Sequence, residues 1–336
     1  MSTPALRRGA GARVTLPAGA WALVALIAIL AATAPSFLTV GNLENVSRTA
    51  AILALAASAQ AIVIVTGGLD LSAGSAVGLM SVVSVLAVGA GTVPAFGAGV
   101  AVVLAIGVFN GLLVARFDIP PFLVTLGTLT GVHGLATLLS GGDPVEAPSG
   151  GAFSWPSNGD VLGVPVPLII AVIGLATLAV ILHRTTLGRC WYLVGSSPAA
   201  ARAAGVRSRR VVFLGYVVGA VFLAVAAIML TARVRSGQPN LQATLAFEAI
   251  AACAIGGFSL TGGAGSAGGV VVGVLVVSLT ANGLRLLNLP SDVQMIAIGV
   301  ITVAAVLGQE LRMRRSRPAS SARSPGTAQP MEGSAG

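Results

Sequence analysis

Long apolar stretches separated by short polar connections dominate the chain. Ten of them can be counted, near residues 19–34, 49–66, 74–92, 96–115, 121–140, 165–183, 211–231, 244–258, 267–284 and 292–309. A helix needs about 20 residues to cross about 30 Å of hydrocarbon, and most of the stretches reach that length. The stretch at 244–258 is shorter, which predicts a tilted or broken helix. The pattern predicts an all-α polytopic membrane protein with about ten transmembrane helices.

Composition agrees with this fold class and limits the chemistry. Of the 336 residues, 55% are hydrophobic and only 9% are charged, whereas a soluble domain carries about 25% charged residues. The chain contains arginine but no lysine, which excludes a phosphate-loop ATPase motif and Schiff-base catalysis. The two cysteines and two histidines are isolated in sequence, so no metal site or disulfide is expected. We therefore expect no cofactor in this chain, and any ATP and Mg must be bound by a partner.

The arginines predict the orientation of the chain in the bilayer. Ten crossings place both termini on one side, and the segments on that side hold 15 of the 19 arginines. The four on the other side are Arg48, Arg233, Arg235 and Arg285. The positive-inside rule then predicts cytoplasmic termini. The net charge of +9 reflects this bias, so we expect no nucleic-acid partner.

Three regions follow from the same pattern. Residues 1–17 are predicted to be a cytoplasmic N-terminal segment, 18–311 a transmembrane domain, and 312–336 a disordered cytoplasmic tail rich in Ser, Pro, Ala, Gly and Arg. A secretory signal is the other interpretation of the N-terminus. The first apolar run continues past residue 30, which favours a first span over a cleaved signal.

The basic loop 184–210 contains signals for a short helix. Ser197 suits the N-cap, Pro198 the first turn, and Gly205 the position after the helix end. A short capped helix between two spans can dock a cytoplasmic partner. Composition alone leaves this hypothesis beside a simpler one, in which the loop only fixes topology.

A few polar residues within or near the apolar stretches are candidates for a translocation path or gate. They are Asp70, Asn110, His133, Glu248 and Asn282. A charge inside the bilayer is costly and usually faces protein or water. Each also has a structural interpretation: Asp70 can cap the following helix, Glu248 can favour a helix dipole, and the amides can bond across helices.

One glycine motif, at residues 263–268, matches G-x-G-x-x-G letter for letter. Nucleotide binding would need a strand before it and a βαβ unit around it, whereas its neighbours here are predicted spans. We interpret the glycines as a tight turn with close helix packing.

Several motifs together resemble the permease subunits of ribose-type ABC sugar importers. They are TGGLDLSAGS at 66–75, NGLLVARFDIPPFLVTLGT at 110–128, GLATLLSGGDPV at 134–145, AIAACAIGGFSLTGGAGSAGG at 249–269 and ANGLRLL at 281–287. Their order and spacing carry the resemblance, which covers about residues 38–311. The family often has Asn where Ser197 stands and Arg where His133 stands, which puts transfer of substrate specificity in doubt.

The resemblance implies a type II ABC importer-like permease in a bacterial cytoplasmic (inner) membrane, without catalytic residues. It implies two permease copies, cytoplasmic ABC ATPase subunits and an extracytoplasmic sugar-binding protein as partners. It also assigns an ATPase-coupling loop, whose residues here are Gly195, Ser197, Pro198, Ala200, Ala201, Arg202, Gly205 and Val206. Two alternatives stay open: a permease for branched-chain amino acids or nucleosides, and an ion-coupled secondary transporter using Asp70 and Glu248.

Overall fold

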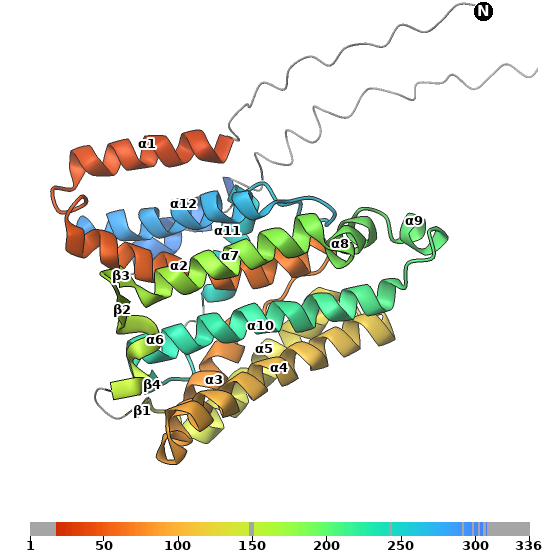
Figure 1. Cartoon of the computed structure of the whole chain (residues 1–336), viewed down its shortest axis with the longest axis horizontal. Coiled ribbons are helices and arrows are strands. Elements are labelled where there is room, and N and C mark those ends of the chain that lie inside the picture. The colour runs from red at the N-terminus through yellow and green to blue at the C-terminus, as the bar shows by residue number, and fades with distance from the viewer. Residues whose placement is uncertain are drawn as a thin grey trace, which may run out of the picture.

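The computed structural model describes residues 18–147, 151–241 and 244–290, and residues 292–307 except 298, 302, 305 and 306. Within these residues the chain forms a bundle of helices that run roughly side by side (Figure 1). The predicted N-terminal segment 1–17 and the predicted tail 312–336 lie outside the described residues.

Six helices are long and apolar enough to cross a membrane. They are α2 (Val40–Val65), α4 (Thr92–Phe117), α5 (Pro121–Ser140), α7 (Val166–Arg184), α10 (Ser208–Val234) and α12 (Ala267–Leu286). Shorter apolar helices occupy the other four predicted stretches: α1 (Ala18–Thr33), α3 (Ala73–Leu86), α11 (Leu245–Ile255) and a helix at Asp292–Ile301. The prediction of a helical, polytopic membrane protein is confirmed, with six helices of full spanning length among the described residues.

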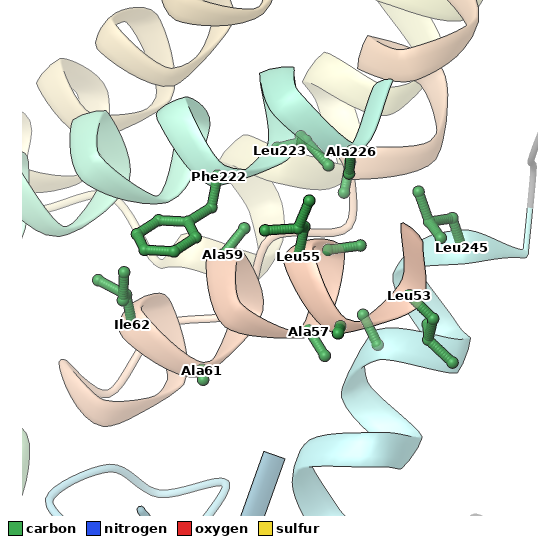
Figure 2. Packing of buried hydrophobic residues seen from close by; sticks show 14 of the residues in the cluster. Leu53, Leu55, Ala57, Ala59, Ala61, Ile62, Phe222, Leu223, Ala226 and Leu245 are labelled. Carbon is green, nitrogen blue, oxygen red and sulfur yellow. The ribbon is translucent and has the colours of Figure 1, made fainter. Parts of the chain in front are cut away.

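Helix α2 is the centre of the bundle. Every residue from Ala50 to Val65 is buried, as expected for a helix that is apolar on all sides. Its many alanines let neighbouring backbones approach closely. Figure 2 shows Leu55 and Ala59 of α2 packed with Phe222 and other residues of α10, and Leu53 near the start of α11. The helices α7, α10, α11 and α12 therefore pack around one central helix.

The two ends of the bundle differ (Figure 1). At one end, here called the strand end, two small antiparallel pairs join connecting segments. They are β1 (Val145–Glu146) with β4 (Ser236–Gly237), and β2 (Asp160–Val161) with β3 (Val164–Pro165), beside η1 (Val88–Ala90), η2 (Gly151–Phe153) and α6 (Trp155–Asn158). At the opposite end, here called the α9 end, two short helices protrude. They are α8 (Thr186–Ser196) and α9 (Pro198–Ala203).

Candidate functional site

The predicted short helix in the loop 184–210 is present as α9, and its first residues are those that the sequence indicates. Ser197 has an extended backbone, with φ −158° and ψ 94°. The backbone N–H of Ala200 donates to its hydroxyl at 3.2 Å. Pro198 occupies the first turn, where its missing N–H leaves no donor unsatisfied. Local sequence alone thus fixes where α9 begins.

The end of α9 is equally well defined, and its two faces differ. Gly205 has φ +75°, and the N–H of Val206 donates to the carbonyl of Ala201 at 2.9 Å, as in a glycine-terminated helix. Ala201 is fully buried, whereas Ala200 and Arg202 are exposed. α9 therefore rests on the bundle through Ala201 and presents Ala200 and Arg202 outward.

Helix α8, just before α9, was not predicted from the sequence. The side chain of Trp191 in α8 is fully buried, and its Nε1 donates to the carbonyl of Val211 on α10 at 2.9 Å. The hydroxyl of Tyr192 donates to the carbonyl of Gly265 at 2.8 Å. The signal that could have revealed α8 is the spacing of Leu187, Trp191 and Val194, which recur every three or four residues. α8 fixes α9 to the bundle.

The end of α8 meets the end of α2 and the α11–α12 loop so closely that there is no room for side chains between them. A Cβ atom on Gly195 would collide with the carbonyl oxygen of Val65 at the end of α2. The same carbonyl accepts the N–H of Gly263 at 3.0 Å, and a Cβ on Gly263 would lie 2.6 Å from Ser196. The 263–268 glycines therefore form a tight turn after α11, as predicted. We call this contact of α2, α8 and the α11–α12 loop the glycine junction.

Helix α3 is shorter than a span because the chain before it runs back along α2. The predicted span 74–92 is divided here into α3, η1 and the start of α4, and the 14 residues of α3 cover about 21 Å. Residues 66–72 connect the end of α2 to α3. With its amide oriented to satisfy both groups, Gln60 of α2 pairs with the backbone N–H and C=O of Asp70, each at 3.1 Å. The sequence places residues 67–73 between two apolar stretches and does not indicate that they fold back along α2; we call residues 66–72 the re-entrant segment.

Asp70 and Asn110, two of the candidate path residues, belong to one hydrogen-bond chain. The backbone N–H and hydroxyl of Ser72 donate to Asp70 Oδ1 at 2.9 and 2.6 Å. Asn110 donates to the Ser72 hydroxyl at 2.9 Å, and Thr128 donates to Asn110 Oδ1 at 2.6 Å. Asp70 thus closes a turn ahead of α3 rather than capping the first amides of that helix directly. The chain of bonds ties the re-entrant segment to α4 and α5.

In this geometry Asp70 stabilises the turn by accepting two hydrogen bonds from Ser72, which an uncharged oxygen could also accept. We expect Asp70→Asn, which keeps Oδ1, to retain uptake within about threefold, whereas Asp70→Ala loses both bonds and about 1–3 kcal/mol of stability. Uptake into membrane vesicles and thermal unfolding of the purified chain would measure the two effects. If Asp70→Asn abolished uptake at normal expression, the carboxylate charge itself would take part in transport.

The other three candidate path residues lie apart from this network. His133 is half-buried on α5. Asn282 of α12 exchanges two hydrogen bonds with Asn42, at 3.1 and 2.7 Å, which ties α12 to the start of α2. Glu248 accepts from the hydroxyl of Thr244 at 2.8 Å and lines a cavity of about 420 Å³ at the strand end. The five residues predicted for a path therefore do not converge on one site within this chain.

Among the described residues, no group of three or more His, Cys, Asp or Glu side chains could hold a metal ion. The notable feature of this part of the chain is instead a structural connection between two helices. An exposed, capped helix is joined through the glycine junction to the central helix of a membrane bundle. The fold and the α9 end thus define a polytopic helical membrane protein with a short, capped helix exposed at one end.

Comparison with known proteins gives the family. Residues 42–306 match the family model described as branched-chain amino acid transport system / permease component. The chain therefore belongs to this family of transport permeases. The prediction that it is a permease subunit rather than an enzyme is confirmed.

Individual relatives agree over most of their length. The ribose import permease protein RbsC of Bacillus subtilis is 36% identical over 86% of this chain and 90% of its own. The protein of the same name from Escherichia coli is 34% identical over 85% and 91%. The L-arabinose ABC transporter permease protein AraH of Azospirillum brasilense is 32% identical over 87% and 86%. No solved structure matches the chain. The resemblance to ribose-type importer permeases is confirmed.

Proposed function

We propose that this chain is the membrane-spanning permease subunit of an ATP-driven ABC importer for a simple sugar, such as a ribose-like pentose, a hexose or a related polyol. The observation that carries the proposal is the exposed, capped α9, which packs on α8 and α10. A cytoplasmic ATPase that binds ATP and Mg would dock on α9, and an extracytoplasmic binding protein would deliver the sugar. The names of the relatives support a sugar over the branched-chain amino acids of the family description.

The proposed orientation places the α9 end in the cytoplasm of a bacterium and the strand end outside its inner membrane. The arginines support it. Those at the α9 end are Arg116, Arg184, Arg189, Arg202, Arg207, Arg209 and Arg210, against Arg48, Arg233, Arg235 and Arg285 at the strand end. Arg48 is also neutralised by Asp160 at 2.9 Å. This bias is what the positive-inside rule describes.

Ten crossings follow if the shorter helices also span. α3 reaches across with the re-entrant segment 66–72, and α11 with the loop that leads into α12. Within residues 66–72 only Gly67 is exposed, and a membrane tolerates irregular backbone that is buried in protein. The loop that leads into α12 is more exposed, which fits its place at the α9 end. A second permease copy would complete the path, because the five candidate path residues do not converge within one chain. The least buried of the six long helices is α5, which makes it a face available for that copy.

The mechanism is alternating access. The ATPases close on each other when they bind ATP, and α9 passes their movement through the glycine junction to α2. The bundle supplies two packing states, and the nucleotide shifts the balance between them. The chain itself makes and breaks no covalent bond.

The test is extraction of the tagged chain from its native membrane, followed by reconstitution with whatever remains bound. We expect a stoichiometric ATPase with a phosphate-loop motif, and ATP-dependent uptake of labelled ribose once the binding protein is added. Unlabelled ribose or arabinose should compete, and leucine or a nucleoside should not. Competition by leucine would instead favour the amino-acid permease. Uptake by the isolated chain, driven by an ion gradient, would overturn the importer.

A further inference from the structure

A cavity of about 780 Å³ opens beside α9, between the end of α4, the start of α10 and the re-entrant segment. Four arginines line it: Arg202, Arg207, Arg209 and Arg210. Only Arg209 has an acidic partner among the described residues, Asp118 at 2.7 Å. The cavity thus carries three cationic side chains that no carboxylate of the described chain neutralises.

Two hydroxyl groups in the wall of this cavity also lack partners. Ser208 and Tyr216 both line it, and the hydroxyl oxygen of each is buried without a hydrogen bond among the described residues. Tyr216 is only 2% exposed. Its hydroxyl lies so near Gly68 that a Cβ there would be 2.9 Å away. Buried hydroxyls are normally satisfied, so two polar groups without partners lie just behind the surface of this cavity.

The remainder of the lining is largely apolar and includes Val114, Val194 and Val212. The cavity also lies at the last turn of α4 and the first turns of α10, which the proposed orientation places at the cytoplasmic surface of the membrane. A ligand that fits must therefore join an anionic head to an apolar stem. Arginine forks match phosphate oxygens in geometry, and basic pockets between helices at the cytoplasmic face suit anionic lipid headgroups.

We propose that this cavity binds the phosphate headgroup of an anionic phospholipid. Arg207 and Arg210 hold the phosphate, with Arg202 of α9 at the rim, and the apolar wall receives the upper part of the lipid chains. Because Arg202 belongs to α9 and Arg210 to α10, a lipid bound between them would hold the docking helix against the bundle. The proposal rests on the proposed orientation of the α9 end, but not on the identity of the sugar.

The test is titration of the purified full chain, without ATPase or sugar, with phosphatidylglycerol or phosphatidylcholine, read by native mass spectrometry. We expect phosphatidylglycerol to bind and Arg207→Gln/Arg210→Gln to weaken its binding by about tenfold or more. The matched control is Arg116→Gln/Arg189→Gln, which removes two arginines from the same end but outside the cavity lining. This control should bind as the parent chain does. Size-exclusion profiles of the parent chain and of both double variants guard against a folding defect.

Each outcome bears on the lipid assignment. Equal loss in both double variants would mean attraction to a basic surface and would overturn a defined site. Competition by inorganic phosphate or glycerol 3-phosphate at the same concentrations as the lipid would indicate a soluble anion instead. Absence of lipid binding, with weaker ATPase recovery in the Arg207→Gln/Arg210→Gln variant, would assign the cavity to an acidic segment of the ATPase. Because the assay uses neither ATPase nor sugar, its failure would leave the importer function standing.

Discussion

Replacing Ala200 with glutamate is expected to lower ATP-driven uptake by about tenfold or more, which corresponds to about 1.4 kcal/mol at the docking surface. Ala200 is exposed on α9, so the larger, charged side chain would press against a docked ATPase. The helix itself should not suffer. Position 200 is the third residue of α9, and a glutamate there completes a capping box with Ser197. The loss would therefore reflect docking and not unfolding.

The measurement is ATP hydrolysis and uptake by the reconstituted complex, together with the amount of chain in the membrane. We expect ATP hydrolysis whose rate no longer rises when the sugar and its binding protein are added. The amount of chain in the membrane should be unchanged. Ala90→Glu is a matched control, because Ala90 is exposed at the strand end, away from the ATPase. Ala201→Glu is not equivalent, since Ala201 is fully buried and its replacement would unseat α9. Coupled uptake at the parent level by Ala200→Glu would remove α9 from the docking surface.

The parts of this structure that could be predicted are those that local sequence decides. The boundaries of α9 follow from a cap, a proline and a glycine within nine residues, so Ser197, Pro198 and Gly205 were assigned correctly. The apolar stretches likewise placed the helices. By contrast, α8 lies inside the basic loop 184–210, for which only the short helix at Ser197 was predicted. The amphipathic spacing around Trp191, which indicates α8, was overlooked.

The partners of the buried polar groups could not be predicted, because they come from distant parts of the chain. Asn42 and Asn282 are 240 residues apart, and nothing in the sequence near either residue indicates the other. Asp70 could be recognised as an isolated charge, but its bond chain to Asn110 and Thr128 depends on how α4 and α5 pack. The five polar residues predicted for a path therefore include some, such as Asn282, whose hydrogen bonds hold two helices together.

Replacing Gly195 with alanine is expected to have the second large effect, because the methyl group has no space. The added Cβ would collide with the Val65 carbonyl and lie 2.6 Å from the Gly263 N–H nitrogen. Relief requires α8 to move away from both Val65 of α2 and Gly263 of the α11–α12 loop, which would open the glycine junction. Overpacking of this kind costs about 1–3 kcal/mol. Since the junction connects α9 to α2, we expect uptake to fall by about tenfold or more.

The control must be a helical glycine with open surroundings, and Gly41 on α2 has no atom within 4 Å of its added Cβ. Gly41→Ala should leave uptake unchanged and should not lower the unfolding temperature, since alanine favours a helix over glycine by about 0.5–1 kcal/mol. Hydrolysis measured beside uptake separates two causes of a defect in Gly195→Ala. If ATP is still hydrolysed while uptake is lost, the junction transmits movement from α9 to α2. If the variant transports normally, α8 can shift without consequence. Movement of α9 would then reach the bundle through the contact of Trp191 in α8 with Val211 in α10.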